Sequence, residues 1–160
     1  FFTVRDHQLW VEGVSLASLA QAHGTPLFVY SQAAMLQALA AYQKGLAGRR
    51  HQICYAMKAN SSLAILQTLV RAGCGLDIVS GGELERALAA GMAPEDIVFS
   101  GVGKSGEEMV AALKAGIGQF NIESEEEGRT LVPIPSAAAT NRSATAPSSA
   151  SAAAPTAMPR

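Results

Sequence analysis

Short apolar segments alternate with longer amphipathic segments along most of the chain. The apolar segments, which are typical of buried strands, cover residues 27–30, 52–57, 76–79, 96–100 and 119–122. Apolar residues recur at helical spacing in the segments between them, at residues 31–46, 63–72, 82–90 and 106–115. Successive strand centres lie about 21 to 26 residues apart, so the pattern predicts an α/β fold of about five βα units around a parallel sheet.

The first residues follow a different pattern. Residues 2–5 and 9–12 are rich in strand-forming side chains on either side of Asp6-His7-Gln8, which predicts a small β-hairpin. Ser15 then begins a short helix that ends at Gly24. We therefore expect an N-terminal hairpin at residues 1–14 and the sheet with its helices at residues 15–127.

Three strand-to-helix junctions carry the sequence Ser-x-x-Glu. They are Ser80 to Glu83, Ser105 to Glu108 and Ser124 to Glu127. In this capping box the serine side chain and the glutamate side chain satisfy free backbone amides at the start of a helix. Three matches in phase with the predicted strands support the βα assignment.

The pattern ends after Glu127. Five of the seven prolines and many alanines and serines follow, with almost no large apolar residue after Ile134. Such a segment buries too little apolar surface to offset the entropy of ordering it, so we predict disorder over residues 128–160 and no helix after the third capping box. We interpret this tail as a frameshifted or mis-joined continuation.

The candidate chemistry lies at Lys58. This lysine ends the apolar segment 52–57, and in a strand it would share a face with Cys54 and Ala56, which leave room around its amine. A desolvated lysine amine is a usable nucleophile toward carbonyl groups. Alternatively, Lys58 ends the strand and reaches water, as most lysines do.

Composition and charge exclude several classes of function. A net charge of -1 argues against a nucleic-acid partner. His7, His23 and His51 have no partners at metal-ligand or triad spacing, and Cys54 and Cys74 are expected to be free thiols. No apolar segment approaches the roughly 20 residues needed to span a membrane, so we expect a cytoplasmic protein without a metal site.

The loop Gly101-Val-Gly-Lys-Ser105 lies between a predicted strand and a predicted helix, as phosphate loops do. That motif also requires a glycine five residues before Gly103, where this chain has Val98. The loop therefore does not predict a nucleotide triphosphate site.

Four motifs in order carry a resemblance to a known family. They are Tyr55-Ala-Met-Lys-Ala-Asn-Ser61, Gly75-Leu-Asp-Ile-Val-Ser-Gly-Gly-Glu-Leu84, Ile97-Val-Phe-Ser-Gly-Val-Gly-Lys-Ser105 and Phe120-Asn-Ile-Glu-Ser124. With them, the chain from Phe2 to Glu127 resembles the N-terminal half of the diaminopimelate decarboxylase family, pyridoxal-phosphate enzymes of the alanine-racemase-like fold type. Residues 26–31 resemble the family's first barrel strand, whereas the tail matches nothing in it.

The resemblance implies part of a (β/α)₈ TIM barrel, in which Lys58 ends the second strand. It implies that Lys58 holds pyridoxal 5'-phosphate covalently and that Asp77 lies near the cofactor and its lysine. Asp77 has an alternative role as a turn residue, and Ser80 is expected to be a helix cap. The implied reaction is decarboxylation of meso-diaminopimelate to L-lysine, by a homodimer acting on a small amino-acid substrate.

Several alternatives stay open. An ornithine or arginine decarboxylase, an alanine racemase or a non-catalytic pyridoxal-phosphate carrier shares the implied fold, and a remnant without function of its own belongs to another class. A whole barrel takes about 250 residues, and the family's ring-stacking residue, phosphate loop and ring-nitrogen acid come from later strands. We therefore expect the chain alone to be inactive, with unpaired strand edges that favour aggregation.

Overall fold

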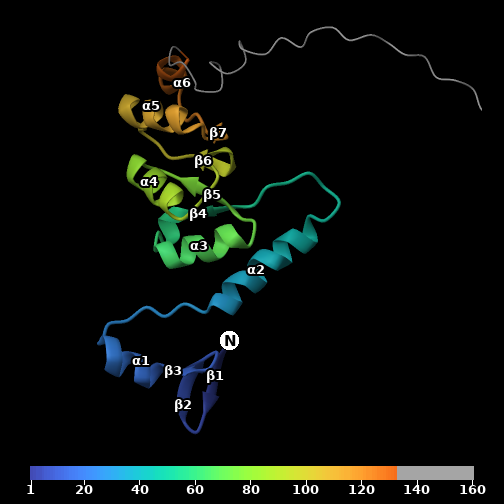
Figure 1. The fold of residues 1–160 in the computed structure, drawn as a ribbon, viewed down its shortest axis with the longest axis vertical. Coiled ribbons are helices and arrows are strands. Elements are labelled where there is room, and N and C mark those ends of the chain that lie inside the picture. Colours follow the sequence, from blue (N-terminus) through green and yellow to red (C-terminus); the bar gives the residue numbers. More distant parts are fainter. Residues whose placement is uncertain (133–160) are drawn as a thin grey trace, which may run out of the picture.

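The structure, a computed structural model, describes residues 1–132 of the 160-residue chain. Within them the chain forms an N-terminal antiparallel sheet and a larger parallel sheet, with α2 (Gln32–Gly45) between the two. Figure 1 shows an elongated array, with the antiparallel sheet at one end and α6 (Glu125–Leu131) toward the other. The predicted α/β class with a parallel sheet is confirmed.

The antiparallel sheet contains the predicted hairpin. It consists of β1 (Phe2–Arg5), β2 (Gln8–Val11) and β3 (Val14–Ser15), in that order, followed by α1 (Leu16–His23). Asp6 and His7 have φ angles of 49° and 59°, as the tight turn between two twisted strands requires. At the next turn Glu12 accepts hydrogen bonds from Ser31 Oγ (2.6 Å) and from the Ala33 amide (2.9 Å), which joins this sheet to the start of α2.

The parallel sheet has four strands in the order β4-β5-β6-β7. The strands are β4 (Cys54–Ala56), β5 (Gly75–Ile78), β6 (Ile97–Phe99) and β7 (Gln119–Phe120). The helical elements after and between them are η1 (Met57–Ala59), α3 (Leu63–Arg71), α4 (Gly81–Ala89), η2 (Pro94–Asp96), α5 (Gly106–Ala115) and α6. Figure 1 shows α3, α4 and α5 stacked along one side of the strands, as in successive βα units of a barrel wall.

The predicted strand at residues 27–30 is wrong. This segment is not hydrogen-bonded to any strand of residues 1–132, and Phe28 is 86% exposed. Apolar side chains indicated burial, but a strand also needs a neighbouring edge, and this segment runs between the antiparallel sheet and α2 without one. The described part of the parallel sheet thus has four strands instead of five, and β4 is its first strand.

The prediction that no helix follows Ser124 is also wrong. The Ser124 side chain accepts a hydrogen bond from the Glu127 amide, and α6 continues to Leu131. The capping box therefore starts a helix even where the following residues lack a strong apolar pattern. The expected disorder of residues 128–160 lies, from residue 133 onward, outside the described residues.

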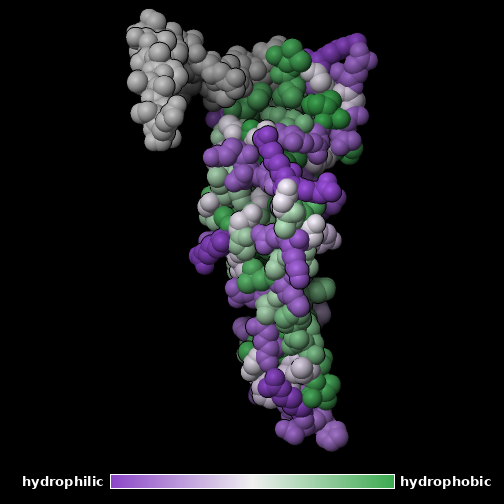
Figure 2. Space-filling view, turned by 90° about the vertical axis from the view of Figure 1, so that its right-hand side faces the viewer, coloured by the Kyte–Doolittle hydropathy of each residue, from purple (hydrophilic) through white to green (hydrophobic). Residues whose placement is uncertain are grey.

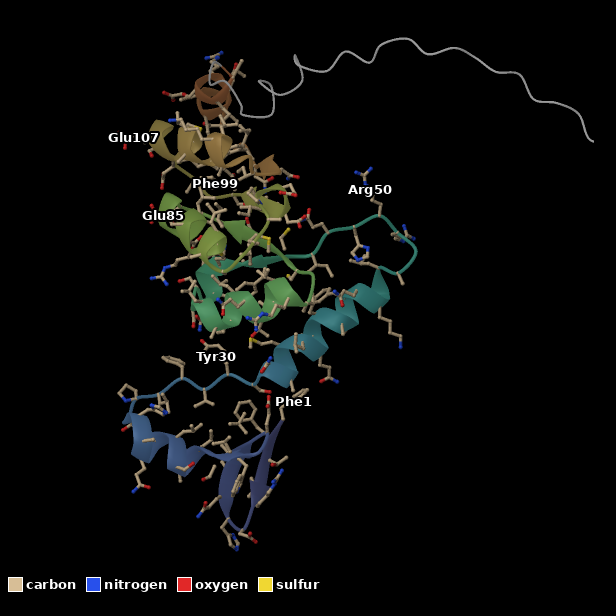
Figure 3. The ribbon with its side chains drawn as sticks, viewed as in Figure 1. Phe1, Tyr30, Arg50, Glu85, Phe99 and Glu107 are labelled. Atoms are coloured by element: carbon tan, nitrogen blue, oxygen red, sulfur yellow. The ribbon has the colours of Figure 1, made fainter. Side chains whose placement is uncertain are left out.

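The main core lies between the parallel sheet and its helices. Alternate strand residues have no exposed surface and face the helices: Leu76, Ile78, Ile97 and Phe99. Figure 3 shows Phe99 within the stack of β6 and its neighbouring helices, whereas Glu85 and Glu107 lie toward the outer side of α4 and α5. This alternation leaves the intervening strand residues on the opposite face of the sheet.

Hydrophobic and hydrophilic residues are interspersed along the side of the molecule shown in Figure 2. Among residues 1–132 no helix has the length and apolar character that a membrane crossing requires.

Candidate functional site

The candidate site lies at the carboxyl ends of the parallel strands, the end at which barrels of this kind carry their chemistry. Lys58 follows β4 directly, in the 3₁₀ turn η1. Asp77 lies in β5, where its backbone pairs in register with Ala56. The structure thus brings the two predicted site residues to adjacent strands. They form no ion pair with each other among the described residues.

The alternation of side chains predicted that Lys58 extends the strand, and this prediction is wrong. The strand ends at Ala56, and Lys58 is exposed, so the expected desolvation of its amine is not found. Within residues 1–132 its side chain makes no hydrogen bond or ion pair. The amine is accessible to a reagent from solution.

Asp77 points to the face of β5 opposite the helices. Its neighbours Leu76 and Ile78 are fully buried in the core, whereas Asp77 is half-buried on the other face. Its Oδ1 atom is shielded from solvent and has no hydrogen-bond partner among residues 1–132. Because a buried carboxylate oxygen without a donor is costly, this atom marks a place where a donor fits.

Cys54 shares that face of the sheet, since it lies two residues before Ala56 in β4. Burial raises the pKa of the Cys54 thiol, with smaller contributions from Cys74, Asp77 and Asp96. Burial also raises the pKa of Cys74, whose thiol donates to the Ile53 carbonyl. Both cysteines are free, as predicted.

The sequence interpretation overlooked Lys104. Its side chain is fully buried and donates to the carbonyl oxygens of Gly101 and Asn121, each at 2.8 Å, and to the carboxylate of Glu127. The ammonium group also lies 5.7 Å from the ring centre of Phe99. Lys104 therefore ties the loop after β6 to the loop after β7. The signal in the sequence was the single lysine that follows Gly101-Val-Gly103, in a loop that was considered only as a phosphate loop.

The three predicted capping serines all accept a hydrogen bond from the amide three residues later. Only Ser105 forms the reciprocal box, in which Glu108 also accepts from the Ser105 amide. Glu108 reaches further and accepts from the Gly81 amide (2.8 Å) at the start of α4. These backbone hydrogen bonds, with that from Gly81 the largest cause, lower the pKa of Glu108 below 4.5.

The residues at the carboxyl ends fit an aldehyde cofactor that carries hydrogen-bond donors. The exposed Lys58 amine can bond to an aldehyde carbon, and the unpaired Oδ1 of Asp77 can accept from a donor. No group of three or more His, Cys, Asp or Glu residues that could hold a metal ion occurs in the described part of the chain.

Comparison with protein families gives a match over most of the chain. Residues 32–140 match the family described as "Pyridoxal-dependent decarboxylase, pyridoxal binding domain". The match contains Lys58, Asp77 and Lys104, and it extends past residue 127, where the sequence pattern changes. The prediction that residues after Glu127 match nothing in the family is therefore wrong for residues 128–140.

Individual relatives belong to the same group of enzymes. Diaminopimelate decarboxylases of Vibrio cholerae and Pseudomonas aeruginosa are 56% and 52% identical over 126 residues, which cover 79% of this chain and 30% of theirs. A crystal structure of the Helicobacter pylori diaminopimelate decarboxylase, complexed with L-lysine, is 47% identical. It matches with a TM-score of 0.70 over 74% of this chain and 30% of that one. The chain thus spans about 30% of the length of the curated relatives it matches.

Proposed function

Since the chain belongs to the family of pyridoxal-dependent decarboxylases, we propose that it is the cofactor-binding part of a diaminopimelate decarboxylase and that Lys58 binds pyridoxal 5'-phosphate covalently. The observation that carries the proposal is the exposed Lys58 at the carboxyl end of β4, together with the unpaired Asp77 oxygen on the adjacent strand β5. Identities of 52% and 56% to diaminopimelate decarboxylases support this substrate class over ornithine, arginine or alanine.

Each residue has a defined part. The Lys58 amine forms the covalent bond to the cofactor, for which it must first lose a proton. The Asp77 carboxylate on the adjacent strand accepts a hydrogen bond from a donor of the cofactor through its unpaired Oδ1. When bound, the cofactor supplies an electron-withdrawing ring that takes up the electrons left by the departing carboxyl group.

The whole reaction, conversion of meso-diaminopimelate to L-lysine and carbon dioxide, is proposed for a cytoplasmic homodimer of full family length. The 160-residue chain alone is expected to bind the cofactor at Lys58 and to lack decarboxylase activity.

The test is selective labelling. The chain has four lysines, of which Lys44 and Lys114 are exposed like Lys58, whereas Lys104 is buried. After incubation with pyridoxal phosphate and borohydride reduction, peptide mass spectrometry should find the adduct at Lys58 in clear excess over Lys44 and Lys114. Before reduction, a Lys58→Ala variant should lack the visible absorbance that the covalently bound cofactor gives in the wild type. Equal labelling of the three exposed lysines would refute the proposal.

A further inference from the structure

The turn that carries Lys58 is held by a hydrogen bond that spans the lysine. The Tyr55 hydroxyl donates to the carbonyl oxygen of Asn60 at 3.2 Å, so a residue three positions before Lys58 is joined to one two positions after it. Between them Met57 has no exposed surface and packs in the main core. The backbone around Lys58 is thus fixed from the strand, from the core and from across the turn.

The following residues are fixed as well. The Asn60 side chain accepts from the Ser62 amide at 2.9 Å, directly before α3. Arg86 of α4 donates to the Ser61 carbonyl at 3.3 Å. These hydrogen bonds fix the backbone between the turn and α3, but neither of them spans Lys58.

Tyr55 is suited to this role because its ring is held on two sides. The half-buried ring packs against the main core. It also packs against a second, smaller core cluster that contains Leu39, Ile65 and Leu69. A tyrosine has only two side-chain torsions, so its packed ring delivers the hydroxyl at a defined point. Lys58, in contrast, has a long flexible side chain that makes no hydrogen bond or ion pair among the described residues, so the position of its backbone largely determines where the amine can go.

We propose that Tyr55 is a positioning residue for Lys58: its hydroxyl closes the turn at residues 57–60 and so aims the amine at the cofactor aldehyde. This inference rests on the proposed cofactor role of Lys58. It adds a residue that touches neither cofactor nor substrate and acts through the backbone of the turn.

The experiment compares Tyr55→Phe with Tyr42→Phe in the full chain. Tyr42 is 67% exposed and its hydroxyl makes no hydrogen bond in residues 1–132, which makes it a matched control. The probe is pyridoxal phosphate, and the readout after borohydride reduction is occupancy of Lys58 relative to Lys44 and Lys114 in the same sample. Loss of one hydrogen bond should lower the relative occupancy of Lys58 by about two- to tenfold in Tyr55→Phe and leave Tyr42→Phe unchanged.

Hydrogen exchange of the amides at residues 58–60 gives a readout that does not depend on the cofactor. These amides should exchange faster in Tyr55→Phe than in Tyr42→Phe, while those of β5 and β6 stay protected. Unchanged exchange would overturn the inference even if Lys58 binds the cofactor. A different result would be equal labelling of the exposed lysines in the wild type together with faster exchange in Tyr55→Phe. That result would refute the proposed function but still show that the Tyr55 hydroxyl stabilises the turn at residues 57–60. Arg86→Gln provides a second variant, expected to change exchange at residues 61–62 and to affect Lys58 less.

Discussion

The Lys104 ammonium group and the Glu127 carboxylate form an ion pair in which the lysine side chain is fully buried. The pair joins the loop after β6 to the first turn of α6, two segments 23 residues apart in the sequence. The buried lysine also donates to two carbonyl oxygens, so its ammonium group has three hydrogen-bond partners. Removal of either partner leaves the other charge without its counter-charge, with only backbone hydrogen bonds remaining.

Lys104→Met is therefore expected to lower the free energy of unfolding by about 3–5 kcal/mol. The control is Arg129→Met, which removes the Arg129–Glu125 pair, whose side chains are 74% and 81% exposed. That change should cost less than about 1 kcal/mol. Urea unfolding of both variants measures the difference, and similar losses in the two would show that burial of the Lys104 pair does not matter.

Stability at acidic pH should depend on Glu108. Hydrogen bonds from the Gly81 and Ser105 amides lower its pKa in the folded chain below 4.5. A carboxyl group with a lowered pKa contributes stability above its unfolded-state pKa, and this contribution is lost as the pH falls through the folded-state pKa. The thermal midpoint of the wild type should thus fall as the pH drops below 4.5.

In Glu108→Gln this acid-dependent loss should be shallower, because the side chain no longer titrates and its contribution is already missing at pH 7. Glu107→Gln is the matched control, since Glu107 is exposed on the same helix and accepts no hydrogen bond within residues 1–132. Thermal midpoints measured from pH 7 down to pH 3 should be parallel in the wild type and Glu107→Gln. A parallel curve for Glu108→Gln would contradict the assignment.

Asp77→Asn should separate cofactor binding from stability. The unpaired Oδ1 loses no hydrogen bond within the chain when the charge is removed, so the free energy of unfolding should change by less than about 1 kcal/mol or rise. Occupancy of Lys58 by pyridoxal phosphate should fall about tenfold, the effect of one charge interaction of about 1.4 kcal/mol. Asp6→Asn in the hairpin turn is the control, and equal occupancy in both variants would remove Asp77 from the site.

At Gly118 the backbone closely approaches that of Glu95. A Cβ atom at this position would lie 2.0 Å from the Glu95 carbonyl oxygen, so Gly118→Ala must displace the backbone before β7. We expect a loss of about 1–3 kcal/mol in the free energy of unfolding. Gly106→Ala at the start of α5 meets no atom within 4 Å and should instead stabilise the helix by about 0.5–1 kcal/mol. Changes of the same sign in the two variants would contradict this reading of the packing.

The strands and helices of the parallel sheet were predictable because their signals are local. Ser80, Ser105 and Ser124 each follow a short apolar segment, and a capping serine acts on an amide only three residues away. The segment 27–30 carried the same apolar signal, but pairing depends on a partner edge that no local pattern encodes. At these three junctions the prediction required only neighbours in sequence, and the structure follows it.

The candidate site was predictable in position and less so in detail. Lys58 and Asp77 lie toward the carboxyl ends of adjacent strands. Their placement was predictable because consecutive strands of a βα series pair with each other. The strand alternation failed for Lys58, because the chain turns into η1 after Ala56. The Lys104–Glu127 pair and the Tyr55–Asn60 bond depend on how the loops fold back, which spacing alone does not specify.

Glu108 belongs to α5, yet it closes the first turn of α4 through the Gly81 amide. The start of α4 is therefore incomplete without α5. During synthesis, a chain that has only reached the end of α4 still lacks the acceptor for the Gly81 amide. Opening of α5 should release the start of α4 in the same event, so that the two helices exchange their amide protons with one shared rate instead of fraying one at a time.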